Sequence, residues 1–109
     1  DEALLDPVTA LSGSGPAYVF LLVEAMAAAG AKLGLAPDMA MQLARATVSG
    51  SGELLRQSSE SASQLRVNVT SPGGTTAAAL QVLMAADGLQ PVFDRALAAA
   101  SQRSKELAG

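Results

Sequence analysis

Apolar stretches separated by prolines and glycines divide the chain into helical segments. The expected helices cover residues 7–11, 16–33, 37–57, 74–86 and 90–107. Four of them begin at or near a proline, whose missing N–H costs nothing in the first turn of a helix. Alanine, the best helix former, makes up 23 of the 109 residues, while β-branched and aromatic residues are sparse. The pattern predicts an all-α fold, and the length predicts one domain over residues 1–109.

Capping residues mark the expected ends of these helices. Asp6 is the expected N-cap of helix 7–11, and Ser12-Gly13-Ser14-Gly15 is expected to break the chain before helix 16–33. Gly34 is the expected C-cap of that second helix. Asp87-Gly88 is expected to end helix 74–86.

The helix over 16–33 is unusually apolar. Between Ala17 and Ala31 only Glu24 is charged. The run is short and interrupted for a membrane span, which needs about 20 apolar residues. A helix that is apolar on all sides is otherwise buried on all sides. Because a chain of 109 residues rarely surrounds one helix completely, we expect a homodimer with this helix at its centre.

Two segments allow more than one structure. Ser49-Gly50-Ser51-Gly52 lies inside helix 37–57, where each glycine costs roughly 0.5–1 kcal/mol relative to alanine. Either a close helix crossing offsets that cost, or the segment is a flexible linker. In 58–70, Leu65, Val67 and Val69 alternate with polar residues. This spacing fits a short strand, and it equally fits a helix over 61–67 followed by an extended link.

Composition excludes several classes of site. Without histidine or cysteine the chain has no Ser–His–Asp triad, disulfide, or imidazole or thiolate metal ligand, and we expect no metal. The chain has seven Lys and Arg and ten Asp and Glu, a net charge of −3. It therefore lacks the excess of basic residues that is typical of a nucleic-acid binder. The first residues, Asp1-Glu2, lack the layout of a secretory signal. We therefore expect a soluble, cytoplasmic domain bound to neither membrane nor nucleic acid.

Two motifs suggest chemistry but support it weakly. Glu53 and Glu60 could share a helix face, yet two solvated surface acids are the simpler interpretation. Gly13-Ser14-Gly15 suggests a dinucleotide fingerprint, but Tyr18 stands where the third glycine belongs and no hydrophobic strand precedes the motif. We therefore expect a turn into the apolar helix, and no nicotinamide cofactor bound by this chain alone.

Ser71-Pro72-Gly73-Gly74-Thr75-Thr76 is the strongest candidate site. The first N–H groups of the following helix have no internal partners and lie at the positive end of its dipole. The glycines would let an anion approach those groups closely. Because no lysine follows the glycines, a small carboxylate suits the segment better than a nucleotide. The alternative is a tight turn followed by a threonine that caps the helix.

Two motifs resemble those of a known family. They are Leu11-Ser12-Gly13-Ser14-Gly15-Pro16-Ala17-Tyr18, and Val69-Thr70-Ser71-Pro72-Gly73-Gly74-Thr75-Thr76 with Ala79-Leu80 after it. Both closely resemble the C-terminal domain of pyrroline-5-carboxylate reductase, and the resemblance covers essentially the whole chain. It implies an interlocked helical dimerisation domain of the 6-phosphogluconate dehydrogenase C-terminal type, a homodimer that forms a decamer in some members.

The resemblance also implies an activity. The family reduces 1-pyrroline-5-carboxylate to L-proline with NAD(P)H, the last step of proline biosynthesis. The cofactor sits on an N-terminal Rossmann domain, which is absent from these residues, so this chain alone is expected to be inactive. The competing hypotheses are a dimerisation module without a ligand of its own, and the helical domain of another reductase. The Pro-Gly-Gly-Thr-Thr segment argues against the second of these.

Six residues receive roles from the same resemblance. The backbone N–H groups around Gly74, Thr75 and Thr76 would hold the substrate carboxylate, and the Thr76 hydroxyl would orient the ring nitrogen. Val69 and Ser71 would line the pocket, and Glu60 falls where members often have an acid. Many members have alanine at the position of Thr75, which argues against a direct role for its hydroxyl.

Overall fold

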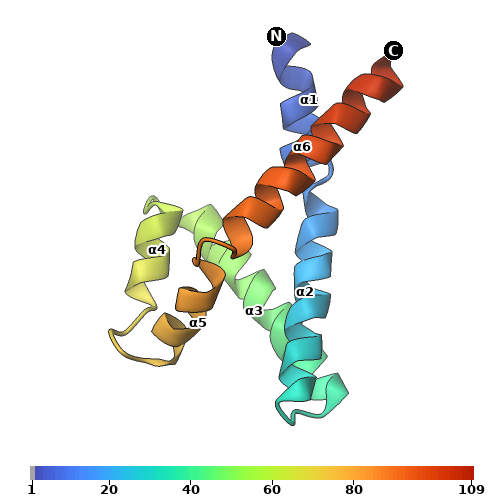
Figure 1. The fold of residues 1–109 in the computed structure, drawn as a ribbon. Coiled ribbons are helices and arrows are strands. Elements are labelled where there is room, and N and C mark those ends of the chain that lie inside the picture. Colours follow the sequence, from blue (N-terminus) through green and yellow to red (C-terminus); the bar gives the residue numbers. More distant parts are fainter. Residues whose placement is uncertain (1) are drawn as a thin grey trace. The chain divides into compact units, whose positions relative to one another are not determined.

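The computed structural model describes residues 2–109, which form helices joined by short loops with no strand among them. A 3-10 helix covers Glu2–Leu4, and a π-helical turn covers Thr9–Gly13. The α-helices are α1 (Leu5–Val8), α2 (Gly15–Lys32), α3 (Pro37–Gln57), α4 (Ala62–Asn68), α5 (Thr75–Leu83) and α6 (Leu89–Ala108) (Figure 1). The predicted all-α fold is confirmed.

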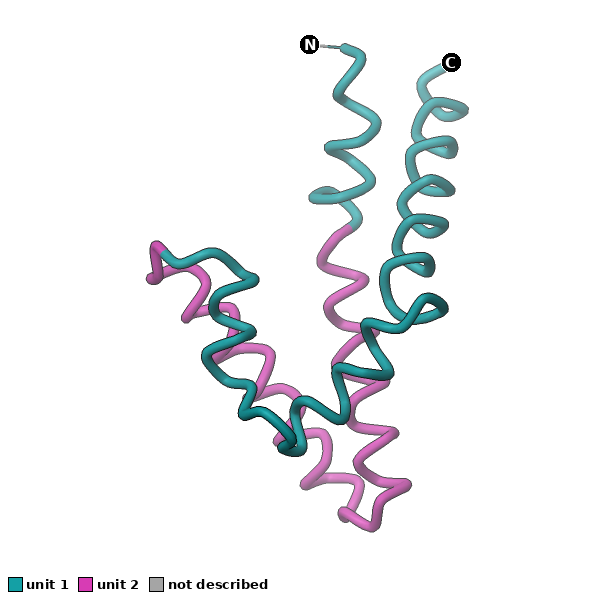
Figure 2. Tube along the Cα trace, turned by 60° about the vertical axis from the view of Figure 1, so that its left-hand side comes forward, with its two compact units in different colours: residues 1–14, 60–109 teal, residues 15–59 magenta. Residues whose placement is uncertain are grey.

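The helices divide into two compact units (Figure 2). The first, here called the terminal unit, joins the residues up to Ser14 with Glu60–Gly109. The second, here called the hairpin unit, is Gly15–Ser59 and holds α2 and α3. The candidate site at 69–76 therefore belongs to the terminal unit, and the most apolar helix belongs to the hairpin unit.

Small side chains hold the hairpin unit together. α2 and α3 pack against each other, and the buried side chains at their contact are Ala27, Ala40 and Ala44. Between the helices Gly34 has a φ of +108°, a left-handed conformation that favours glycine. The Leu35 N–H donates to the Gly30 carbonyl at 3.2 Å, and the Gly34 N–H donates to the Ala31 carbonyl at 3.0 Å. This bonding is a Schellman motif, which confirms the predicted C-cap.

In the terminal unit, α6 packs along α1 and the π-helical turn. Ala10 in that turn is buried, and the Ser104 hydroxyl donates to the Asp6 carboxylate at 2.6 Å. Two predictions are wrong here. Asp6 is not an N-cap, because it lies inside α1, where its carboxylate accepts from α6 instead. Residues 12–15 do not break the chain, because the Ser14 N–H bonds the Thr9 carbonyl at 2.8 Å and only Ser14 is bent.

The ambiguous segments are helical. α4 forms because the Ser61 hydroxyl accepts from the Gln64 N–H at 3.0 Å, an N-cap that favours a helix over the alternating strand. Residues 49–52 lie within α3 and are not a linker. A Cβ at Gly50 or Gly52 meets no atom of the described chain within 4 Å, so these residues make no close crossing with another helix of the same chain. α5 ends at Leu83, before the expected Ala86.

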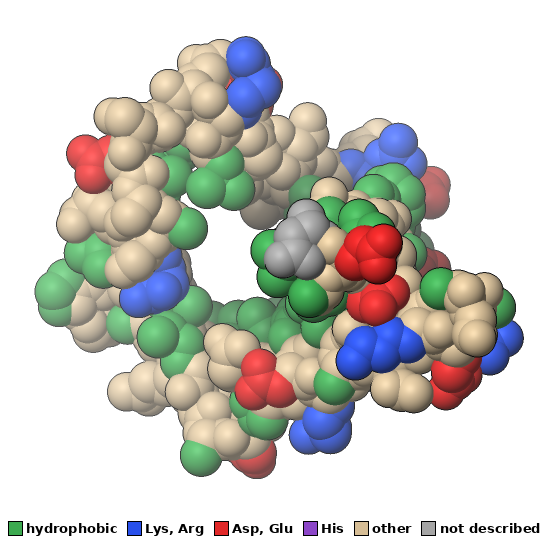
Figure 3. Space-filling view, turned by 90° about the horizontal axis from the view of Figure 1, so that it is seen from above, with side chains coloured by type: hydrophobic (Ala, Val, Ile, Leu, Met, Phe, Trp, Pro, Cys, Tyr) green, Lys and Arg blue, Asp and Glu red, His purple; other side chains and the backbone are tan. Residues whose placement is uncertain are grey.

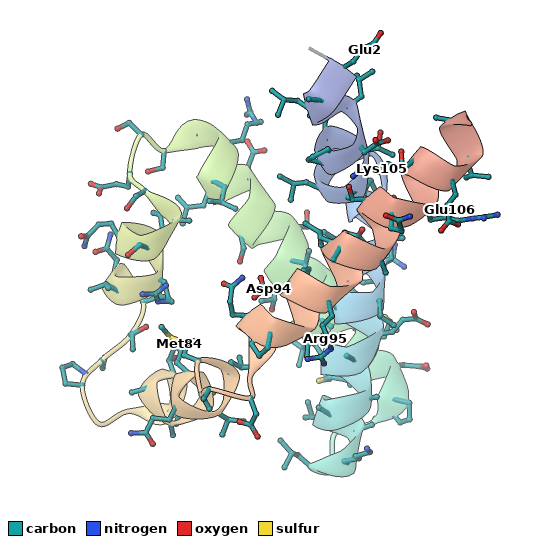
Figure 4. The ribbon with its side chains drawn as sticks, turned by 45° about the horizontal axis from the view of Figure 1, so that its top comes forward. Glu2, Met84, Asp94, Arg95, Lys105 and Glu106 are labelled. Atoms are coloured by element: carbon teal, nitrogen blue, oxygen red, sulfur yellow. The ribbon has the colours of Figure 1, made fainter. Side chains whose placement is uncertain are left out.

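The chain buries little apolar surface by itself. Its buried hydrophobic residues, among those described, are four alanines, while Phe20 is 67% exposed. Apolar and charged side chains alike lie on the surface (Figure 3), and Asp94, Arg95 and Glu106 project from α6 (Figure 4). A large apolar surface is left to be covered by something else.

Glu2–Lys32 is long and apolar enough to cross a membrane, with 6% of its most apolar window buried. The stretch is longer than the sequence predicts, because the chain remains helical through the π-helical turn. Length alone therefore does not exclude a membrane span. A membrane and a second copy of the chain are both kinds of cover that this surface allows.

Replacing Gly34 tests the helix end that turns the hairpin unit. Gly34→Ala should lower the free energy of unfolding by about 1–2 kcal/mol, because an L-residue is strained in the left-handed region. Denaturant unfolding at one fixed protein concentration measures the change. Gly15→Ala is the control, since φ is not positive there and a Cβ meets no atom within 4 Å. Equal stability of the two variants would contradict the prediction.

Candidate functional site

A tight turn shapes the candidate site. The Gly74 N–H donates to the Ser71 carbonyl at 3.0 Å, and Gly73 has a φ of +71°. With Pro72 in the second position and a left-handed residue in the third, this is a type II β-turn. The turn is anchored where α4 ends, since the Thr70 hydroxyl donates to the Arg66 carbonyl at 2.6 Å. These residues therefore fix the direction in which the chain enters α5.

The turn leads directly into α5, and the start of this helix has no side-chain cap. The N-cap residue is Gly74, and no side chain bonds the first turn of the helix. The first α5 amide with a backbone acceptor is that of Ala78, which donates to the Gly74 carbonyl at 3.1 Å. Among residues 2–109, nothing accepts from the N–H groups of Thr75, Thr76 or Ala77. The expected tight turn is present, but the alternative in which a threonine caps the helix is wrong.

These three N–H groups form the polar part of the site. They lie at the positive end of the α5 dipole, where a negative charge is stabilised. A side chain at Gly74 would crowd the turn that leads to these groups, because its Cβ would lie 3.2 Å from the Ser71 carbonyl oxygen. The segment 69–77 contains no lysine or arginine. The geometry therefore suits an anion held by neutral hydrogen-bond donors.

The predicted side chains lie close to this turn, with one exception. Ser71 supplies the carbonyl that closes the turn, and Thr75 and Thr76 are the first residues of α5. Val69 is 65% exposed at the end of α4. Glu60 precedes α4, whose rise separates its two ends by roughly 10 Å. Within this chain, the structure brings the other five predicted residues together and leaves Glu60 at the far end of α4.

The two threonines differ in their surroundings. Thr75 is exposed, whereas Thr76 is half-buried. In the part of the chain that the structure describes, neither hydroxyl makes a hydrogen bond. Both are available to a bound molecule, and Thr76 is the better sheltered from water.

Sequence reasoning missed one donor and correctly treated Glu53 as a surface acid. The Ala77 N–H belongs to the site, and the only signal for it was the position of the helix start. Glu53 accepts from Arg56 at 3.0 and 2.6 Å, and also from Gln57, on the exposed face of α3. The hydrogen bond from Arg56 lowers the pKa of Glu53 below its usual value. Glu53 is thus an ionised surface acid.

Comparison with protein families and curated sequences identifies relatives. Residues 2–107 match the family model described as "Pyrroline-5-carboxylate reductase dimerisation". Pyrroline-5-carboxylate reductase from Pseudomonas aeruginosa is 50% identical over 99% of this chain and 39% of its own length. The enzyme from Mycobacterium leprae is 47% identical over 97% of this chain and 42% of its own length. The chain spans about two fifths of these relatives.

Solved structures agree with the sequence relatives. A pyrroline-5-carboxylate reductase from Coxiella burnetii superposes with a TM-score of 0.92 at 45% identity, over 98% of this chain and 39% of that one. The Plasmodium falciparum pyrroline carboxylate reductase with NADP bound has a TM-score of 0.90 at 37% identity, over 100% of this chain and 41% of that one.

Amide hydrogen exchange tests the open helix start. The N–H groups of Thr75, Thr76 and Ala77 should exchange at rates close to those of an unstructured peptide, because they have no acceptor. The Ala78 N–H should be protected by its bond to Gly74. Exchange followed by NMR gives each rate separately. Strong protection of all four amides in the free protein would show that the site is occupied by the protein itself.

Proposed function

Since the chain belongs to the pyrroline-5-carboxylate reductase dimerisation family, we propose that the protein containing it reduces 1-pyrroline-5-carboxylate to L-proline with NAD(P)H. In this proposal the chain supplies the dimer contacts and the site for the substrate carboxylate. The observation that carries the proposal is the unpaired N–H groups of Thr75, Thr76 and Ala77 beyond the type II turn. The cofactor would be bound by the part of the protein outside this chain, and it would supply the hydride.

The substrate matches the chemistry of the site. It is a small cyclic imine with one carboxylate, and one carboxylate can accept from the N–H groups at the start of α5. Anchoring it there places the ring beside Thr76, whose hydroxyl would orient the ring nitrogen. Val69 and Ser71 would line the ring. Fixing the imine carbon against a hydride donor is the proximity contribution to the rate.

Thr76 acts in this proposal as an orienting group and not as an acid. Reduction of the imine needs a proton on the ring nitrogen, and an alcohol is too weak an acid to be that proton's source. The hydroxyl oxygen can instead accept a hydrogen bond from the protonated nitrogen. Such a bond holds the reactive bond at a fixed angle without transferring a proton.

We propose a homodimer over a membrane-bound form. Within the hairpin unit, Phe20 is 67% and Leu21 is 64% exposed, and apolar side chains of this size are typical of the core of a protein interface. The dimerisation family matches residues 2–107. Glu24, near the middle of the apolar stretch, is easier to accommodate at a protein interface than in lipid. The competing function is a dimerisation module with no ligand, which the same surface would allow.

Blocking the helix start separates the two functions. In the full-length protein, Gly74→Val should weaken L-proline binding by roughly 10-fold or more, because it strains the turn that positions the donors, and the bonds of these donors to a charged group are worth about 1.5–3 kcal/mol. Isothermal titration calorimetry measures the affinity. Ala79→Val, on an exposed position of the same helix, controls for a β-branched residue in α5. Unchanged affinity in Gly74→Val would favour the module without a ligand.

The two threonine hydroxyls should contribute unequally to the reaction. Thr76→Ala should lower kcat/KM by roughly 10-fold, the value of one hydrogen bond, whereas Thr75→Ala should change it less than about 3-fold. Steady-state kinetics on the full-length protein give both values. Thr76→Ser keeps the hydroxyl and should recover most of the loss. The reverse ranking of the alanine variants would overturn the role given to Thr76.

A further inference from the structure

A groove between α2 and α3 combines an apolar lining with two opposite charges. It lies wholly inside the hairpin unit and has a volume of about 700 Å³. Its apolar lining includes Val19, Phe20, Val23 and Met41. Glu24 from α2 and Arg45 from α3 line the same groove. We refer to it as the α2–α3 groove.

Both charges stand alone in apolar or uncharged sequence. Glu24 is the one charged residue between Ala17 and Ala31, and Arg45 is the one charged residue between Met39 and Gly52. Over residues 2–109, neither side chain makes an ion pair or a hydrogen bond. By contrast, Glu53 and Arg56 on the same α3 pair with each other at 2.6 Å. The chain thus leaves an acid and a base unpaired in one largely apolar groove.

Covering the α2–α3 groove would make these charges costly unless they found partners. Moving an unpaired ion out of water costs several kcal/mol. In a twofold dimer, a residue i that contacts the partner's residue j is matched by the reverse contact. A groove carrying one acid and one base is therefore complementary to a second copy of itself. Burying both charges in such an interface would form two identical ion pairs.

We propose that a second copy covers the α2–α3 groove and that Glu24 pairs with the partner subunit's Arg45, twice per dimer. The inference rests on the homodimer proposed above and adds which face is covered and what sets its register. The apolar lining would supply most of the affinity. The ion pairs would select one orientation of the two subunits. Other orientations would place like charges opposite each other or leave the charges unpaired.

Charge reversal in the full-length protein tests the pairing. Glu24→Arg and Arg45→Glu should each raise the dimer dissociation constant at least 10-fold, because each creates two like-charge contacts per dimer. The double variant, with both charges reversed, should return to within about 3-fold of the unaltered protein, as expected when close ion pairs are restored. Sedimentation velocity over a range of concentrations measures the constants.

Mixing the two single variants distinguishes pairing between subunits from pairing within one. A heterodimer of Glu24→Arg and Arg45→Glu chains has opposite charges at both contacts, so it should form in preference to either homodimer. A pair within one chain gains nothing from mixing. If the single variants fail to fold alone, co-expression should still yield soluble heterodimer. Differently tagged chains and native mass spectrometry count the three species.

The matched control is the exposed pair within α3. Glu53→Arg and Arg56→Glu change the same kinds of charge, and their mixture should give heterodimers only in the random proportion. Single variants of Glu24 and Arg45 that dimerise normally would overturn the pairing, and so would rescue by the double variant without rescue by mixing. A monomeric unaltered protein would instead refute the proposed homodimer, which is a separate outcome.

Discussion

The constraint on which the rest of the molecule depends is that, within one chain, its helices fully bury only small apolar side chains and leave the large ones partly exposed. Fixing a residue costs roughly 1–2 kcal/mol of backbone entropy, and burying a leucine or valine recovers about 1.5–3 kcal/mol. Here the buried hydrophobic residues of the described chain are Ala10, Ala27, Ala40 and Ala44. Alanine allows close packing but offers little area. The large side chains remain for a partner, so the proposed homodimer would couple folding to association.

The candidate site escapes this constraint because it is built locally. Pro72 and Gly73 set the backbone angles of the turn, and one hydrogen bond from Gly74 closes it. Neither α4 nor α5 packs extensively against another described element. The turn needs only its own residues to aim the chain into α5, while the position of α5 depends on what covers its apolar side chains. A locally encoded site on a helix supported by association would link substrate binding to the dimer.

The sequence is most informative where single residues decide the backbone. Pro37 and Gln57 bound α3 as expected, and Gly34 ends the preceding helix in the left-handed conformation that its lack of a side chain predicts. The Ser-Pro-Gly-Gly segment likewise identifies the turn. Family resemblance then supplies the roles of Val69, Thr76 and their neighbours, which physical reasoning alone left undecided between an anion site and a simple cap.

The two wrong predictions in the terminal unit have a related physical cause. In each, a hydrogen bond that the local sequence pattern does not indicate replaces the expected one. Asp6 has the chemistry of an N-cap, but the Ser104 hydroxyl, nearly a full chain length away, bonds its carboxylate. Residues 12–15 look like a break, yet one bond from Ser14 back to Thr9 keeps the backbone helical. The first contact has no local signal because it depends on how distant segments meet in the folded terminal unit, and the second is a π-helical bond that the Ser-Gly-Ser-Gly composition does not suggest.

The electrostatics of the helix start also determine how the proposed substrate lies. After protonation the imine carries a negative carboxylate and a positive ring nitrogen, and the N-terminus of α5 carries roughly half a positive charge. That field attracts the carboxylate and repels the protonated nitrogen. A substrate bound with its nitrogen toward the helix start would lose the attraction and also meet the repulsion. The Thr76 hydroxyl offers the nitrogen an uncharged acceptor beside the amides, where a carboxylate side chain would compete with the substrate for them. In the proposed complex, neutral donors would bind the carboxylate and a neutral acceptor would bind the ring nitrogen, without competing with each other.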